Sequence, residues 1–211
     1  MGGPARRGQE TEKENIGEAD RKVDFSIYTF MTVMNPDELL RFLIEQGSLW
    51  VQTQRDRHRP ASRALTAPER AVFGPFFGEQ VLDVGRVRYV PVIENPGFYA
   101  DLRALGVPPP IDFREMEGIT FVDTVLVSGR HHPHDPPLPA LLFHELVHVV
   151  QYSLLGRGRF IERYVHGWAQ NGQNYFRIPM GENAYALQAQ YERNPRLAFS
   201  VETEVRRQLE L

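Results

Sequence analysis

The sequence predicts an α+β fold in which a mainly helical C-terminal half packs against a small mixed sheet. Residues 141–152 form an apolar run typical of a buried helix, and a β-branched run at residues 119–127 predicts a strand shortly before it. Residues 160–168 then repeat apolar side chains at helical spacing, which predicts a second helix packed against the first. One helix beside one strand is therefore the centre of the predicted fold.

The apolar helix carries three polar residues, His144, Glu145 and His148, in the order His-Glu-x-x-His. Residues four apart lie on one helix face, so both imidazoles reach the same metal ion, and Glu145, about 100° round the helix, reaches a water bound to it. All other residues from 141 to 150 are apolar, and buried polar groups are costly unless paired or metal-bound. The alternative is a pair of core histidines hydrogen-bonded within a packed helix.

Residues 144–151, His-Glu-Leu-Val-His-Val-Val-Gln, resemble the active-site helix of HExxH zinc metallopeptidases of the zincin class, and particularly small gluzincin-like proteins. The resemblance is strongest over residues 118–190, where the run at 119–127 stands at the place of the strand that such families carry beside this helix. It implies a zincin-like fold, a Zn²⁺ cofactor and hydrolysis of peptide bonds in a peptide or protein substrate.

The resemblance also implies a third metal ligand downstream of His148. We choose Glu182, which stands near the start of a predicted helix, as the ligand Glu does in gluzincin-like peptidases. Those families usually place Ala or Ser three residues later, where this chain has Tyr185, with an alanine on each side, so the register can be shifted by one. His166, which precedes a glycine as a third His does in some zincins, is the main alternative, followed by Glu192 or a site completed by water alone.

In the implied reaction, His144, His148 and Glu182 hold the zinc ion, and Glu145 accepts a proton from the metal-bound water and passes it to the leaving amine. Stabilising the oxyanion needs a further donor, for which the candidates are Tyr185, His166 and Tyr175; each is equally compatible with a packing role. The competing hypothesis is a non-catalytic zinc-binding or interaction protein on the same scaffold. Glu145 argues against it, since a structural site has no use for a base beside its ligands.

Composition narrows the function classes. The chain has 211 residues, a formal net charge of -3 and no cysteine, so any zinc must be held by His, carboxylate or water. The mixed charges give no basic surface for nucleic acid and no polybasic patch for a membrane. The N-terminus lacks the apolar core of a signal peptide, and no apolar run reaches the length of a bilayer span, so a cytoplasmic location is the expectation.

Three portions are predicted along the chain. Residues 1–22 are polar and charged and form a disordered tail, whose removal is expected to leave folding intact. Residues 23–110 form an N-terminal α+β portion, and residues 111–211 the zincin-like portion, with the proline run at 108–110 as the best boundary. The alternative is one continuous domain over residues 23–211.

Local patterns predict the remaining N-terminal elements. A strand is expected within residues 23–33, followed by a helix that Asn35 caps and that Gly47 interrupts. Residues 55–63, with His58, read as a basic loop. Thr66 to Glu69 form a capping box at the start of a short helix. A strand is expected within residues 81–93 and a helix over residues 98–105, stopped by a glycine.

The C-terminal half ends in short helices separated by glycine and proline. His131, His132 and His134 precede the motif helix, where they suit an exposed loop, a substrate rim or a second metal site. Gly156 should stop that helix. A loop is expected over residues 175–180, a helix from residue 181 to about 192, and a last helix over residues 201–209, capped by Ser200.

Overall fold

A computed structural model describes residues 35–130 and 138–211 of the chain. The fold is α+β, with several α-helices around a four-stranded mixed sheet, so the predicted class and the small sheet beside the motif helix are confirmed. The tail predicted for residues 1–22, the strand expected within residues 23–33, and His131, His132 and His134 lie outside the described residues.

The sheet has the order β1-β2-β4-β3. Its strands are β1 Arg63–Ala64, β2 Arg86–Val90, β3 Gly118–Phe121 and β4 Thr124–Ser128. The central pair, β2 and β4, is parallel, and β1 and β3 add to it antiparallel. The strand expected within residues 81–93 is confirmed as β2, a central strand that ends at Val90, whereas residues 81–84 are helical.

The single strand predicted for residues 119–127 is wrong, because the chain turns back at Val122 to form the β3–β4 hairpin. Val122 has φ 61°, a left-handed conformation that a β-branched residue rarely adopts. The next residue, Asp123, is ion-paired at 2.9 Å with Arg55, near the end of the N-terminal helix, and with Arg59, just after it. These tertiary ion pairs hold the turn in place, and local strand propensity does not reveal them.

Helix α2, Pro36–His58, begins as predicted, since the Asn35 side chain accepts a hydrogen bond from the Asp37 amide. The predicted interruption at Gly47 and the basic loop after it are wrong: the helix continues, and His58 at its end is only 9% exposed. A helix-interior glycine costs about 1 kcal/mol, which the burial of Leu43 and Val51 offsets.

The next helices are α3 Ala67–Phe73, with the predicted capping box, α4 Glu79–Val84 and α5 Tyr99–Ala104.

Helix α6, Leu138–Gln170, carries the motif in its first half and breaks at Gly156, where φ 71° and ψ 160° leave the helical region. This confirms the predicted stop and the second helix after it. By length and composition α6 is, among the described residues, the one helix that can cross a membrane, but 61% of its apolar window is buried inside the molecule. The sequence analysis, which expects no apolar run of that length, does not anticipate this.

Two further helices cover α6. Helix α7, Pro179–Arg193, starts at the proline that had been assigned to a loop, since proline suits a first helical position. Helix α8, Val201–Gln208, is capped by Ser200 as predicted. The short 3₁₀ turns are η1 Arg59–Ala61, η2 Phe113–Glu115 and η3 Tyr175–Arg177.

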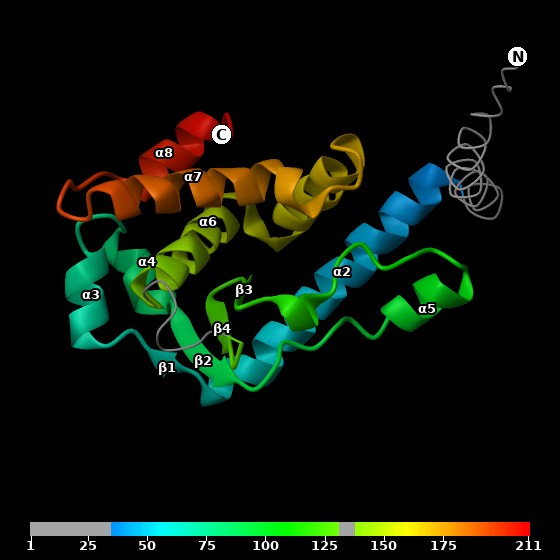
Figure 1. Cartoon of the computed structure of the whole chain (residues 1–211), viewed down its shortest axis with the longest axis horizontal. Coiled ribbons are helices and arrows are strands. Elements are labelled where there is room, and N and C mark those ends of the chain that lie inside the picture. Colours follow the sequence, from blue (N-terminus) through cyan, green and yellow to red (C-terminus); the bar gives the residue numbers. More distant parts are fainter. Residues whose placement is uncertain (1–34, 131–137) are drawn as a thin grey trace, which may run out of the picture.

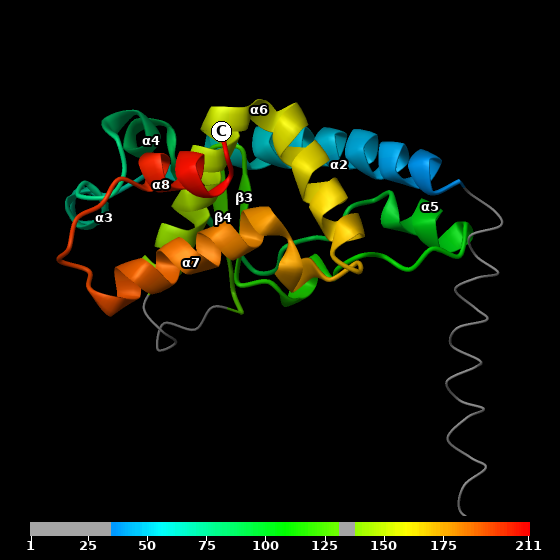
Figure 2. The ribbon, with the colours of Figure 1, turned by 90° about the horizontal axis from the view of Figure 1, so that it is seen from above.

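The molecule has two hydrophobic cores, one towards each end. Helices α3, α4 and α8 lie at one end and α5 at the other, with the sheet and α6 between them (Figure 1), and the view from above shows the same arrangement (Figure 2). The core at the end with α3, α4 and α8 is named the closed core. Its aromatic members are Phe73, Phe76, Phe77, Phe143, Tyr191 and the partly buried Phe199. We call the second the open core, built mainly from α2, α5 and the second half of α6. Both cores combine residues from the predicted 23–110 and 111–211 portions.

Candidate functional site

The motif residues lie in the first half of α6, which packs against both β3 and α7. The centroids of the His144 and His148 rings are 4.9 Å apart, so the two imidazoles share one face as their spacing predicts. His144 is 8% exposed and Glu145 4% exposed, and the residues between and around them are buried. The helix therefore presents three polar side chains inside a protein core.

His148 is oriented by a chain of amide side chains. Its Nδ1 lies 2.8 Å from Gln151 Oε1, while Gln151 Nε2 donates to the Met180 carbonyl at 3.0 Å and to Asn183 Oδ1 at 2.7 Å. Asn183 Nδ2 in turn donates to Gln208 Oε1 of α8 at 2.8 Å. Because the Gln151 amide nitrogen is already donating, its oxygen must accept from His148, which places the proton on Nδ1.

His144 is oriented in a similar way by a glutamine that is more exposed. Its Nδ1 lies 3.0 Å from Gln188 Oε1, and Gln188 Nε2 donates to Glu192 Oε1 at 3.2 Å. Both imidazoles thus carry their proton on Nδ1, and no described residue hydrogen-bonds either Nε2. The two Nε2 lone pairs are therefore available on the same helix face, which is the arrangement of metal-binding histidines whose other nitrogen is fixed by an outer partner.

Glu145 is held against strand β3. The Thr120 hydroxyl lies 2.6 Å from Glu145 Oε2 and 2.9 Å from the Glu145 carbonyl oxygen. Burial raises the pKa of Glu145 to about 7, and the Thr120 hydrogen bond opposes that rise. Strand β3 comes so close that a Cβ on Gly118 would stand 2.8 Å from Glu145 Oε1, so a larger residue there would displace the Glu145 carboxyl group.

The two histidines are neutral at physiological pH in this environment. Burial lowers the pKa of His144 to about 3, with a further contribution from the neighbouring His148, and burial lowers that of His148 to about 4. A neutral imidazole is the form that binds a metal ion. The site thus combines two neutral ligands with a carboxyl group whose pKa is suited to proton transfer near neutral pH.

The predicted third ligands do not join this group. Glu182 and Glu192 are exposed on α7, His166 is half-buried on the second half of α6, and none of the three lines the pocket described below. Across the ranges 35–130 and 138–211, no three His, Asp or Glu side chains are grouped as a metal site would need. One position after Glu182, Asn183 is buried and hydrogen-bonds Gln151 of α6.

Two of the predicted oxyanion donors do come near the motif. The Tyr185 ring centroid lies 4.4 Å from that of His144, and the side chain is 48% exposed. Tyr175 lines the same pocket, and burial raises its pKa to about 12, so its hydroxyl stays protonated and able to donate. Both hydroxyls are consequently available for an oxygen bound beside the histidines, whereas His166 is not.

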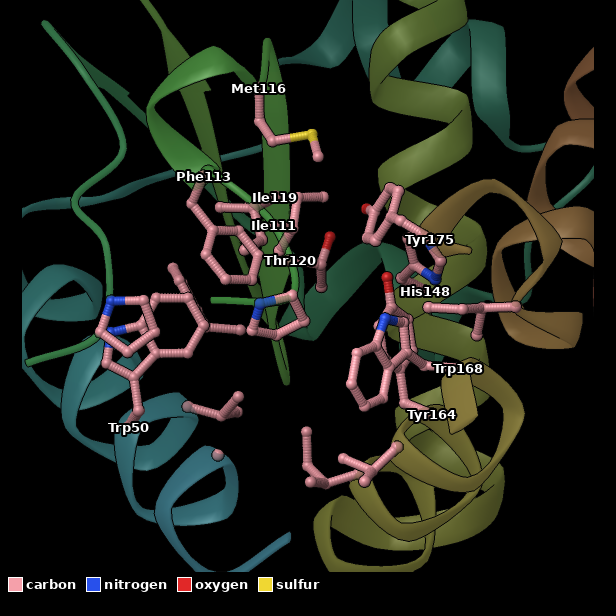
Figure 3. A pocket seen from close by; sticks show the side chains of 18 of the residues that line it. Trp50, Ile111, Phe113, Met116, Ile119, Thr120, His148, Tyr164, Trp168 and Tyr175 are labelled. Atoms are coloured by element: carbon pink, nitrogen blue, oxygen red, sulfur yellow. The ribbon is translucent and has the colours of Figure 1, made fainter. Parts of the chain in front are cut away.

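A pocket of about 550 Å³ opens beside the motif and has His144, Glu145 and His148 in its wall. Figure 3 shows Trp50 and Phe113 on one side of it and His148, Tyr164 and Trp168 on the other. Further parts of the wall come from α2, from the segment between β2 and β3, from residues 118–121 of β3, from η3 and from Tyr185 of α7. This volume is within the range of small-molecule and peptide-binding sites.

Several residues of the site were missed by the sequence analysis. Gln151 follows His148 by three residues, so helical spacing alone places the two side chains side by side and was the signal that could have found it. Thr120 and Gln188 contact the motif, and Asn183 contacts Gln151, only through tertiary packing, for which one sequence carries no signal. The α2 residues of the pocket were hidden for the same reason.

Comparisons with family models, with curated proteins and with solved structures found no match.

Proposed function

We propose that this chain is a zinc-dependent peptidase in which His144 and His148 bind the metal ion and Glu145 is the general base. The observation that carries the proposal is the arrangement of the motif: two imidazoles with Nδ1 fixed by glutamines and Nε2 available, beside a buried carboxyl group in the wall of a pocket. The zincin-like fold, the hydrolase activity and a peptide or protein as substrate all belong to this proposal, and the cytoplasmic location stays a prediction.

The residues fit two of the ligands of a zinc site, since neutral imidazole nitrogens on one helix face are ligands that zinc prefers. A zinc ion bound there would lower the pKa of a coordinated water and polarise a substrate carbonyl. The amide partners of both histidines are uncharged, so they fix the rings without adding negative charge to the site. Glu182 becomes a ligand only if α7 turns it inward, and the proposal does not require this.

Glu145 has the surroundings of a proton carrier. Thr120 and the close approach of β3 at Gly118 hold its carboxyl group in one place, and its pKa of about 7 allows it both to accept and to release a proton near neutrality. Tyr185 and Tyr175 supply hydroxyl donors for the oxygen on which negative charge develops. These roles are those that peptide-bond hydrolysis requires of the protein.

The decisive experiment is a Glu145→Gln variant that retains bound zinc. We expect peptide cleavage to fall by at least about a hundredfold while zinc content is unchanged, because the base is lost and the ligands remain. Cleavage would be followed on a fluorogenic peptide library and on casein. Full activity in this variant would show that Glu145 is not the base.

A second candidate is a non-catalytic binding protein that uses the pocket alone. It is favoured by one observation, that the described part of the chain groups no third carboxylate or imidazole with the two histidines. Equilibrium zinc titration separates the two, since a peptidase must bind one zinc ion per chain. Absence of both zinc binding and cleavage, together with ligand binding in the pocket, would favour this second function.

A further inference from the structure

The open core is covered less completely than the closed core. Among the described residues, five hydrophobic side chains that pack against the closed core are only partly buried, whereas fifteen pack in this way against the open core. Several of the fifteen surround the pocket of about 550 Å³, as Figure 3 shows for Phe113, Ile119 and Tyr164. A large apolar surface of this kind marks a place where another segment of chain or a ligand binds.

Helix α2 forms one wall of this pocket, with the lining residues Leu43, Gly47, Trp50 and Val51. Leu43 stands eight residues after the N-cap Asn35 and Val51 sixteen residues after it, about 12 Å and 24 Å along the helix axis. The far end of this wall adjoins the motif, because the Trp50 ring lies 5.0 Å from that of Phe121 in β3, the strand that holds Glu145. The wall therefore runs from the start of α2 towards the motif.

An apolar run of sequence directly precedes α2. Residues 23–33 read Val-Asp-Phe-Ser-Ile-Tyr-Thr-Phe-Met-Thr-Val, and every second residue except Thr29 is apolar, namely Val23, Phe25, Ile27, Met31 and Val33. This alternation gives an extended segment one apolar face. Eleven extended residues span up to about 36 Å, which exceeds the length of the α2 wall. The run is therefore long enough to lie along the whole wall.

The end of the pocket beside the motif also carries acidic side chains. Glu117 directly precedes Gly118, which lies against Glu145, and both Glu115 and Glu117 line the pocket. Glu115 is ion-paired at 2.7 Å with Arg130, which lies outside the lining, and no Lys or Arg of residues 35–130 and 138–211 lines the pocket. A basic group on the occupant is therefore favoured at this end.

The chain supplies basic groups at the matching place. Arg21 and Lys22 directly precede the apolar run, so they stand at the end of the segment furthest from α2. A segment that lies along α2 brings them towards Glu115 and Glu117. Partly exposed ion pairs contribute little to stability, so these charges set the direction of the segment, and its apolar face provides most of the affinity.

Attachment to α2 favours this segment over a free ligand, since a tethered segment is present at its site at a local concentration on the order of millimolar. We propose that residues 23–33 bind in the pocket of the same chain as an extended segment, with the apolar face against the wall and the basic pair at the acidic end. The bound segment covers His144, Glu145 and His148. That it inhibits cleavage until a substrate displaces it rests on the proposed peptidase function, whereas the binding itself does not.

The chain contains no cysteine, so a pair of introduced cysteines tests the placement directly. Gly47 lies about 18 Å from Asn35 along α2, a length of about six extended residues, which places Thr29 beside it. A Cβ on Gly47 would stand 3.5 Å from Ile161 Cγ2, an ordinary contact. In the full-length Thr29→Cys/Gly47→Cys protein, we expect mild oxidation to form a disulfide within one chain. The matched control is Thr29→Cys/Leu49→Cys, because Leu49 stands at a similar distance along α2 but is 61% exposed and outside the lining. The Gly47 pair should form its disulfide at least about tenfold faster.

A second measurement needs no substitution in the pocket, so it stays informative if the Gly47→Cys variant does not fold. The two tryptophans of the chain, Trp50 and Trp168, both line the pocket. In full-length Phe25→Asp/Ile27→Asp, the introduced charges oppose burial of the apolar face, so the segment leaves and water enters. We expect tryptophan emission to shift to longer wavelength and acrylamide to quench it more strongly than in the wild type.

A charge-matched control changes the opposite face of the segment. Ser26→Asp/Thr32→Asp adds the same two charges at positions that point away from the wall of an extended segment. We expect its emission and its quenching to match those of the wild type. Equal changes in the two double variants would overturn the proposed orientation.

Three further results would overturn the proposal. They are equal oxidation rates for the Gly47 and Leu49 pairs, wild-type emission in Phe25→Asp/Ile27→Asp, and a disulfide between two chains instead of within one, which would identify a second copy as the source of the segment. Because these measurements need neither zinc nor catalysis, segment binding in a protein that cleaves no peptide would reject the peptidase alone. Cleavage equally fast in the wild type and in Phe25→Asp/Ile27→Asp would reject the inhibitory role and leave the peptidase.

Discussion

The two cores of this molecule are built from similar side chains, but the open core surrounds a pocket. In the closed core, aromatic rings interlock, as in the stacking of Phe143 on Tyr191 with ring centroids 4.5 Å apart. In the open core, rings such as Trp50 and Phe113 surround a cavity of about 550 Å³. Helix α6 contributes to both, with Phe143 on one side and His144 and His148 on the other. The difference indicates that stability is concentrated in one core and ligand binding in the other.

The largest expected effect comes from the closed core. Phe143 is 0% exposed and contacts aromatic rings on several elements, so Phe143→Ala should lower the free energy of unfolding by about 3–5 kcal/mol. Urea denaturation followed by far-ultraviolet circular dichroism measures it. The matched change Phe113→Ala, in the pocket wall, should cost about 1 kcal/mol, because one side of that ring already faces a cavity. Equal losses for the two variants would refute the distinction between the cores.

The buried carboxyl group of the open core should carry a stability penalty. Burial raises the Glu145 pKa from 4.5 to about 7, so between these values the native state binds more protons than the unfolded state, and stability falls as pH rises. In zinc-free protein, Glu145→Gln should therefore increase the free energy of unfolding at pH 8 by about 3 kcal/mol and have little effect at pH 4.5. Urea melts of both proteins at the two pH values give the comparison. A pH-independent difference would show that the carboxyl group is not protonated on folding.

The two glutamines that hydrogen-bond the histidines, Gln151 and Gln188, offer a finer comparison. Gln151 is 0% exposed, and Gln151→Ala removes the hydrogen bonds that this side chain makes with His148 Nδ1, the Met180 carbonyl and Asn183 Oδ1. We expect a loss of about 1–3 kcal/mol in stability and about ten- to a hundredfold in zinc affinity. Gln188→Ala removes the more exposed partner of His144 and should lower both the stability and the zinc affinity by less. Competition with a zinc-sensitive dye measures the affinities, and equal affinities for Gln151→Ala and wild type would argue that the amide chain does not orient the metal ligand.

The smallest expected change tests how closely β3 approaches the motif. A Cβ on Gly118 would meet Glu145 Oε1 at 2.8 Å and Leu141 Cδ1 at 2.9 Å, so Gly118→Ala should cost about 1–2 kcal/mol and displace the Glu145 carboxyl group. Gly158→Ala, which meets nothing and lies in a helix, should be neutral or slightly stabilising. Thermal unfolding of both variants measures these changes in stability. Gly118→Ala with wild-type stability would mean that Glu145 moves away without cost.

The sequence predicted those features that depend on local chemistry. The Asn35 cap, the capping box at Thr66, the stop at Gly156 and the Ser200 cap were all readable because each depends on residues within one turn. The motif helix was readable because its polar residues interrupt an otherwise apolar run. The α+β class follows from the same local signals.

Features that depend on tertiary contacts could not be predicted from the sequence. The turn at Val122 depends on ion pairs from residues more than sixty positions earlier, and the continuation of α2 through Gly47 depends on packing against α6. The choice of Glu182 failed to anticipate that α7 turns Asn183 towards α6, because a shift of one residue on a helix moves a side chain by about 100° and no local rule fixes the rotation. The α2 residues that line the pocket could not be predicted from the sequence for the same reason.

The parallel pairing of β2 with β4 has a consequence for how the pocket can open. The chain between these strands must cross the sheet edge and return as β3, and on the way it carries α5, Phe98 and Phe113 past the pocket, at the end of the molecule remote from α7 (Figures 1 and 2). The connection is anchored at its two ends by the sheet, and because Tyr99 and Leu102 of α5 are buried in the open core, outward movement of α5 opens that core locally while the closed core stays packed. Amide hydrogens of α5 should then exchange with solvent well before those of α6, and a ligand could enter on that shorter timescale.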